Sequence, residues 1–260
     1  MSTIEPETKW GLSPRARAVV LTYALAVLAF GVGVVFLTAI AVVYLSATGS
    51  DQISAVASLG MSLIALQGLA FPLVSLTYLH RRGLGLDFLQ YELPSLRELG
   101  QTLLTFIGTI ALIIVAGLVI QTLGLEAASN TAGETASANP EIVPFLILAS
   151  FLLIGPGEEL LFRGVIQGTL RKHFSAPAAI LLASGAFAPL HITALIGDLQ
   201  AGLVTIAVLF IPSLAFGYAY EKTDNLVVPA LAHGLYNATL FGIMYLAVKY
   251  APESTGLLGL

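Results

Sequence analysis

The segment Gly157-Glu158-Glu159-Leu160-Leu161-Phe162-Arg163-Gly164 holds three charged residues inside a stretch whose composition is otherwise that of a membrane span. Each charge at the centre of a bilayer costs about 3 kcal/mol on insertion scales. Three of them kept together either hold helices in place or take part in chemistry. The rest of the sequence indicates which, because it predicts a bundle of membrane helices and supplies polar partners on other spans.

The composition is that of a membrane protein. The chain has 260 residues, of which 57% are hydrophobic and 10% are charged. A soluble domain carries about 25% charged residues, and the mean hydropathy here is +0.91. The formal net charge of -4 gives no reason to expect a nucleic-acid partner. Because cysteine is absent, disulfides and thiolate chemistry are excluded.

Seven stretches are long and apolar enough for membrane spans, each of which needs about 20 residues. They lie near residues 18–46, 53–79, 99–124, 142–170, 176–196, 200–220 and 225–249. We therefore predict an all-α fold, a polytopic membrane helix bundle of seven spans. An eighth membrane helix would arise if the fourth stretch broke near Gly155-Pro156-Gly157.

The basic residues support an odd number of spans. If seven spans alternate, nine of the eleven Lys and Arg fall on one side: Lys9, Arg15, Arg17, Arg81, Arg82, Arg97, Arg171, Lys172 and Lys222. The positive-inside rule places that side, and with it the N-terminus, in the cytoplasm. We expect a multi-pass protein of the cell membrane. The segment 126–140 is small, polar and turn-rich, which predicts a flexible outer loop.

Helix geometry divides the three charges of the opening segment. Residues four apart share a helix face, so Glu159 and Arg163 can pair directly. Glu158 is rotated by about 100° from Glu159 and is left free to face a cavity. An apolar surrounding disfavours the charged form of a carboxylate and so makes it a stronger base. A buried ion-pair network that only fixes helix packing is the alternative, but a second carboxylate beside a satisfied pair favours function.

Two histidines fall inside spans, whereas the other two adjoin basic residues in predicted cytoplasmic loops. His191 ends the sequence Phe187-Ala188-Pro189-Leu190-His191, and His233 begins His233-Gly234-Leu235-Tyr236-Asn237. A lone histidine in a span is often only a hydrogen-bonding partner between helices. His233 and Asn237 share a helix face and can direct two donors at one place. Counting residues from the predicted cytoplasmic boundary puts Glu158 and His233 at similar depth.

These motifs, taken in order, resemble the CPBP intramembrane proteases, the CAAX-protease and bacteriocin-processing (ABI/Rce1-type) family. Glu158-Glu159-x-x-x-Arg163, Phe187-x-x-x-His191 and His233-x-x-x-Asn237 carry the resemblance, and Phe216-Gly217-Tyr218-Ala219-Tyr220 is similar to a weaker motif of the same family. Residues 142–250 would then form the catalytic helix bundle. Residues 1–125 would add three spans and a cytoplasmic loop within one integrated membrane domain.

The resemblance implies an endopeptidase, with a role for each motif residue. Glu158 with His191 would activate a water, His233 and Asn237 would stabilise the oxyanion, and Glu159 and Arg163 would organise the site. Peptide hydrolysis needs both functions. Glu158, His191 and His233 could instead hold a zinc ion with water as fourth ligand. No His-Glu-x-x-His is present, and a glutamate that ligates zinc cannot easily also be the base, so we favour the reaction without metal.

The expected substrate is a membrane-associated peptide or protein in contact with the lipid bilayer. A prenylated C-terminal peptide is the best-known substrate class of the family, but nothing in this sequence selects a lipidated chain. A non-catalytic scaffold or bacteriocin-immunity protein of the same fold is the alternative function. A proton-coupled transporter using Glu158 as carrier is a third hypothesis, although we find no internal repeat of the kind that transporters carry.

Overall fold

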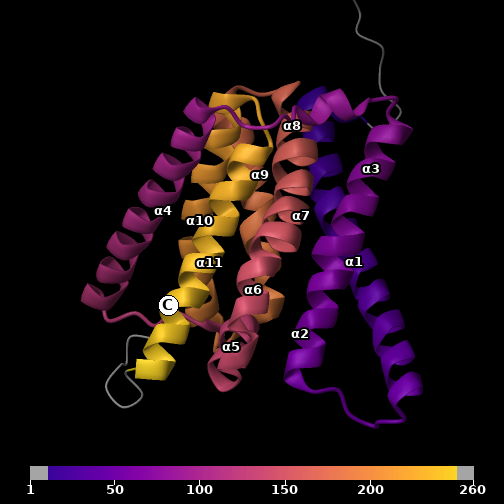
Figure 1. Cartoon of the computed structure of the whole chain (residues 1–260). Coiled ribbons are helices and arrows are strands. Elements are labelled where there is room, and N and C mark those ends of the chain that lie inside the picture. The colour runs from indigo at the N-terminus through magenta and orange to yellow at the C-terminus, as the bar shows by residue number, and fades with distance from the viewer. Residues whose placement is uncertain (1–10, 251–260) are drawn as a thin grey trace, which may run out of the picture.

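The structure is a computed structural model, and it describes residues 11–250. Almost all of that range is helical. The seven candidate spans are Pro14–Thr48, Ala55–Arg81, Leu96–Thr122, Pro140–Arg171, Ala176–Ala194, Leu199–Thr223 and Val227–Tyr250, each long and apolar enough to cross a membrane. The prediction of an all-α polytopic bundle of seven spans is confirmed. In Figure 1 the helices run side by side, with α4 at one edge of the bundle and α1 to α3 at the other.

Several spans are built from more than one helical segment. The first span is α1 (Pro14–Thr48), and the second joins α2 (Ala55–Leu63), the π-helix η1 (Ile64–Ala70) and α3 (Phe71–Arg81). A 3₁₀ turn, η2 (Leu86–Leu89), precedes α4 (Leu96–Thr122). The last three spans are α9 (Ala176–Phe187) with the 3₁₀ helix η6 (Ala188–Ala194), α10 (Leu199–Thr223) and α11 (Val227–Tyr250).

The fourth span carries the charged segment and stays continuous through its two glycines and proline. It runs through η3 (Pro140–Ile142), α6 (Val143–Ala149), η4 (Ser150–Ile154), α7 (Gly155–Glu159), η5 (Leu160–Gln167) and α8 (Gly168–Arg171). The segments η4 and η5 are π-helical, and Gly155 N–H donates to the Ser150 carbonyl five residues back. A wider turn accommodates a residue that cannot complete the α-helical pattern, so Pro156 does not break the span. Residues 11–250 therefore contain seven candidate spans and no eighth.

Side chains at the helix N-termini explain where several helices begin. The hydroxyls of Ser13 and Ser54 accept from backbone N–H groups in the first turns of α1 and α2. Ser95 and Glu98 form a reciprocal capping box at α4, and Asp198 caps α10. Each cap satisfies a backbone donor that has no partner inside the helix.

The predicted outer loop contains ordered structure instead. Within 126–140, β1 (Ser129–Asn130) pairs antiparallel with β2 (Leu195–Ile196), and α5 (Thr131–Ala138) follows. The Asn130 side chain caps α5 by accepting from Gly133 N–H. Ala136 is 1% exposed and packs with a cluster that includes Leu59 and Leu146. The prediction of a loop was wrong because small residues, which resemble a linker in composition, also allow a short helix to pack closely.

The predicted basic side corresponds to one end of the bundle. The N-terminus of α1, the C-termini of α3, α8 and α10 and the N-terminus of α4 all lie at this end (Figure 1). Arg15 Nε donates to the His173 carbonyl at 3.3 Å, and Arg171 Nε lies 2.9 Å from Glu221 Oε2. We call this the basic end. That it faces the cytoplasm remains a prediction, and Lys9 falls outside the described residues.

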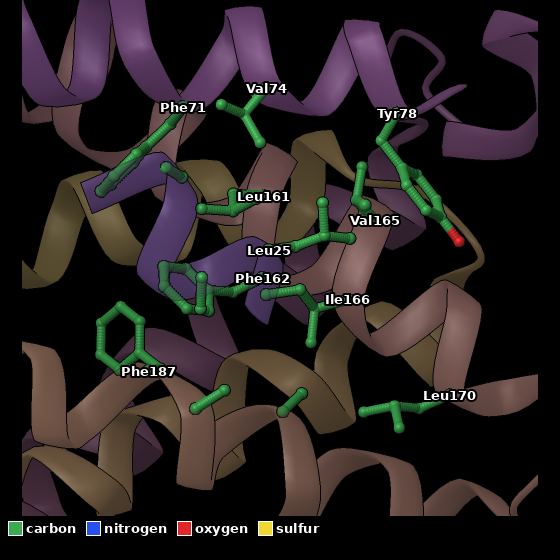
Figure 2. Packing of buried hydrophobic residues seen from close by; sticks show 14 of the residues in the cluster. Leu25, Phe71, Val74, Tyr78, Leu161, Phe162, Val165, Ile166, Leu170 and Phe187 are labelled. Carbon is green, nitrogen blue, oxygen red and sulfur yellow. The ribbon is translucent and has the colours of Figure 1, made fainter. Parts of the chain in front are cut away.

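The largest apolar cluster surrounds η5 (Figure 2). Leu161, Phe162, Val165 and Ile166 of η5 meet side chains of α1, α3 and α9. The Phe162 ring makes edge contacts with two other rings, at centroid distances of 6.2 Å to Phe71 and 4.9 Å to Phe187. This core holds one face of the charged segment against three neighbouring helices.

Two glycines let other helices approach the charged segment. A Cβ on Gly155 would lie 2.6 Å from the Ala230 carbonyl oxygen of α11, and a Cβ on Gly157 would collide with the Gln67 carbonyl of η1. Real Cβ atoms do not come this close to backbone. The absence of these side chains therefore lets α7 pack directly against both η1 and α11.

We expect Gly157→Ala to destabilise the protein, because neither backbone can move away without disturbing the bundle. Overpacking of this kind costs about 1–3 kcal/mol. The matched control is Gly60→Ala in α2 of the same span as Gln67, where an added Cβ meets nothing within 4 Å and alanine has the higher helix propensity. Thermal unfolding in detergent measures both. Equal midpoints for the two variants would contradict the close packing.

Candidate active site

Glu159 and Arg163 form the ion pair that their spacing predicts. Arg163 Nε lies 2.9 Å from Glu159 Oε2, and neither side chain has any exposed surface. The two atoms are not aligned as a hydrogen bond, so the attraction is mainly Coulombic. Arg163 Nη2 donates to Ser213 Oγ of α10 at 3.3 Å, and the guanidinium lies 5.4 Å from the centre of the Phe187 ring. The charge of Arg163 is thus held from three helices.

As predicted, Glu158 does not pair with Arg163. It does, however, have partners on other spans. Its side chain is buried, with 8% exposure. Glu158 Oε1 accepts a hydrogen bond of 3.2 Å from Gln67 Nε2 of η1. Glu158 Oε2 lies 3.9 Å from His233 Nε2 of α11. The second glutamate therefore sits between residues of two other spans.

His233 connects the two glutamates. Its Nδ1 lies 2.9 Å from Glu159 Oε1, while its Nε2 faces Glu158. The ring stacks on Phe216 at a centroid distance of 4.8 Å and an interplanar angle of 21°. One imidazole can reach both carboxylates because its two nitrogens lie on different edges of the ring. Glu158, which the sequence analysis expected to be left free, therefore shares this partner with Glu159.

Two of the expected site residues lie beside this network without bonding to it. His191, in η6, is half-buried, and its Nδ1 lies 3.3 Å from the carbonyl oxygen of Phe187. Its ring is 4.6 Å from the Phe187 ring, which in turn lies 6.3 Å from the ring of His233. Asn237 follows His233 by one turn of α11 and is half-buried. Within residues 11–250 its side chain has no hydrogen-bond partner.

The residues do not form a zinc site in this arrangement. Over the described range 11–250, no three His, Asp or Glu side chains are grouped closely enough to hold a metal ion. The set of Glu158, His191 and His233 is not assembled, since only Glu158 and His233 approach each other.

Gln67 is the site residue that the motifs did not reveal. It comes from the second span, far in sequence from the motif residues, and its Oε1 is buried without a hydrogen-bond partner. A signal was nevertheless present in the sequence. Gln67 is the only amide side chain between residues 53 and 79, and an amide inside a membrane span usually has a partner on another helix.

Comparison with known proteins agrees with the motifs. The family model of the Rce1-like type II CAAX prenyl endopeptidases matches residues 140–239. The resemblance to the CPBP family is confirmed over this segment, which contains every motif residue but not Gln67. No curated protein and no solved structure gave a match.

We expect Arg163→Met to destabilise the protein strongly, because it leaves the buried Glu159 with only His233 as a partner. Removing one member of a buried pair costs about 3–5 kcal/mol. The double variant Glu159→Gln/Arg163→Met should recover part of this loss, since no unpaired charge remains. Thermal unfolding in detergent of the single and double variants measures the coupling.

Arg171→Met is the control, because its pair with Glu221 is partly exposed, at 40% and 16%. Exposed pairs contribute at most about 1 kcal/mol. A loss at Arg163 no larger than the loss at Arg171 would show that burial does not make the Glu159 pair critical.

Proposed function

We propose that this protein, whose residues 140–239 match the Rce1-like type II CAAX prenyl endopeptidases, is an intramembrane endopeptidase of the cell membrane. Its substrate would be a membrane-associated peptide or protein. The observation that carries the proposal is the convergence of Glu158 Oε2 and His233 Nε2, 3.9 Å apart, within a bundle of seven apolar spans. The family match indicates a peptidase of the CAAX type, and the geometry supplies the groups that such a reaction needs.

Glu158, Glu159, Arg163 and His233 form one buried cluster of ionisable side chains. The cluster holds two glutamates and one arginine, all buried, and an uncompensated buried charge is costly. One more proton makes the cluster neutral. Arg163 compensates Glu159, which leaves Glu158 and His233 as partners of each other. His233 Nδ1 faces Glu159 and Nε2 faces Glu158, so Nε2 is the nitrogen that can act beside Glu158 in this proposal.

A water molecule can occupy the corner between these two groups. Two atoms 3.9 Å apart can both lie about 2.8 Å from a third atom, which is hydrogen-bond distance. Glu158 would take a proton from this water while the hydroxide attacks the carbonyl carbon of the scissile bond. The proton then passes to the leaving amine as the carbon–nitrogen bond breaks. His191, whose ring lies 4.6 Å from that of Phe187, would assist the activation of the water.

The negative charge that forms on the carbonyl oxygen needs donors. Protonated His233 can donate through Nε2, and Asn237 offers its amide from the same face of α11 one turn further on. Glu159 and Arg163 act through His233, since Glu159 fixes the orientation of the ring. They are positioning residues in this proposal, whereas Glu158 and His233 touch the reacting atoms.

We expect Glu158→Gln and His191→Ala to abolish cleavage of a membrane-proximal peptide while the protein stays folded. Glutamine keeps the size and the hydrogen bond to Gln67 but cannot act as a base. Cleavage by purified protein in detergent or liposomes, followed by mass spectrometry of the products, measures the loss. Glu126→Gln, at an exposed position, is the control and should retain activity. Full cleavage by both site variants would refute the proposed reaction.

Gln67→Leu should lower kcat about tenfold or more and leave KM nearly unchanged. A hydrogen bond to a charged group contributes about 1.5–3 kcal/mol, and here it fixes the rotamer of the base. Gln121→Leu, at an exposed position of α4, is the matched control. Steady-state kinetics separate the two parameters, and unfolding midpoints exclude a folding defect. A rise in KM with kcat preserved would place Gln67 in substrate binding instead.

A further inference from the structure

A groove of about 700 Å³ opens at the basic end, between α1, α3 and the C-terminus of α8. Its apolar wall includes Leu21 and Ala24 of α1 and Leu84 after α3. Arg17, Arg82 and Lys172 line the same groove. It is separate from the candidate active site, as it shares no residue with the network around Glu158.

The three cations of the groove have no carboxylate partner within residues 11–250. Arg82 lies 5.6 Å from the centre of the Tyr78 ring, and Lys172 Nζ lies 4.6 Å from that of Phe88. An aromatic ring holds a cation in place but leaves its charge uncompensated. Among residues 11–250, no acidic side chain lines the groove, although the chain as a whole has a net charge of -4.

The inner wall of the groove is rigid. Tyr78 is 9% exposed, and its hydroxyl is hydrogen-bonded to Thr169 Oγ1 of α8 at 3.1 Å. Arg15 holds the turn after α8 by donating to the His173 carbonyl. The cations therefore project from fixed elements on two sides of an apolar wall.

The groove combines features of a lipid site rather than of a site for a small soluble anion. Its α1 wall continues into exposed apolar surface, where Val20 is 57% exposed in a helix predicted to face lipid. A phospholipid with its phosphate at the level of the three cations would have its acyl chains alongside α1. Basic pockets between membrane helices on the cytoplasmic side bind anionic headgroups, and the basic end is the side that the positive-inside rule places there.

We propose that this groove binds an anionic phospholipid, with its phosphate between Arg17, Arg82 and Lys172 and an acyl chain along Leu21 and Ala24. Charge-assisted hydrogen bonds from the cations would hold the phosphate, and burial of the chain would add apolar area. The proposal does not depend on the peptidase function, so either can fail alone.

Native mass spectrometry of the delipidated full-length protein tests this, with phosphatidylglycerol and phosphatidylcholine of identical acyl chains as probes. We expect phosphatidylglycerol adducts at a concentration about tenfold lower or less. The triple variant Arg17→Gln/Arg82→Gln/Lys172→Gln should lose this preference. Ala24→Phe, which keeps all three charges but fills the apolar part, should also weaken phosphatidylglycerol binding.

The matched control is Arg81→Gln/Arg97→Gln/Lys222→Gln, which removes three charges from the same end but outside the groove. We expect it to bind phosphatidylglycerol as the unchanged protein does. An equal loss in this control would mean a diffuse attraction to the basic end, and would overturn the groove as the site. Competition by millimolar inorganic phosphate would mean a site for a free anion, which also overturns the proposal. Equal binding of the two lipids would do so as well.

Discussion

The arrangement of the candidate site depends on the buried pair of Glu159 and Arg163. Two fully buried ions are stable only when further groups satisfy them, and here these groups come from different helices: Ser213 from α10, the Phe187 ring from α9 and His233 from α11. The pair therefore does more than connect two residues of one helix. It requires three other spans to meet the fourth at a particular depth, and it fixes the histidine that contacts both glutamates.

The approach of the helices depends on small residues and π-helical turns. Helices in a bilayer have no hydrophobic effect to drive their association, so close packing has to supply the attraction. Gly155 and Gly157 bring η1 and α11 into backbone contact with α7, and Gly234 of α11 admits the Phe151 ring in the same way. The π-helical segments η4 and η5 flank α7, and η1, which packs against it, is π-helical as well. Turns of this kind are frequent at functional sites, and here they let Pro156 remain inside a continuous span.

The sequence predicted the features that depend on composition and local geometry. The spans follow from apolar length, and the Glu159–Arg163 pair follows from the four-residue spacing on one helix. Features that depend on how helices pack were not predictable in this way. Gln67 is distant in sequence from every motif, and the contact of His233 with both glutamates requires the crossing of α7 and α11. The helix α5 was not predicted because flexible linkers and tightly packed short helices are both rich in Ala, Ser, Thr and Gly. Composition alone therefore does not distinguish them.

The segment that matches the family model cannot by itself complete the surroundings of Glu158. Residues 140–239 supply both glutamates, Arg163 and His233, yet one oxygen of Glu158 is satisfied from η1 by Gln67. The same η1 backbone closes against Gly157, so the second span both shields and orients Glu158, which is the base in the proposed reaction. A carboxylate that must hold a water in one position gains from a donor that removes its rotational freedom. The N-terminal spans are therefore part of the chemistry in this proposal, although their sequence carries none of the family motifs.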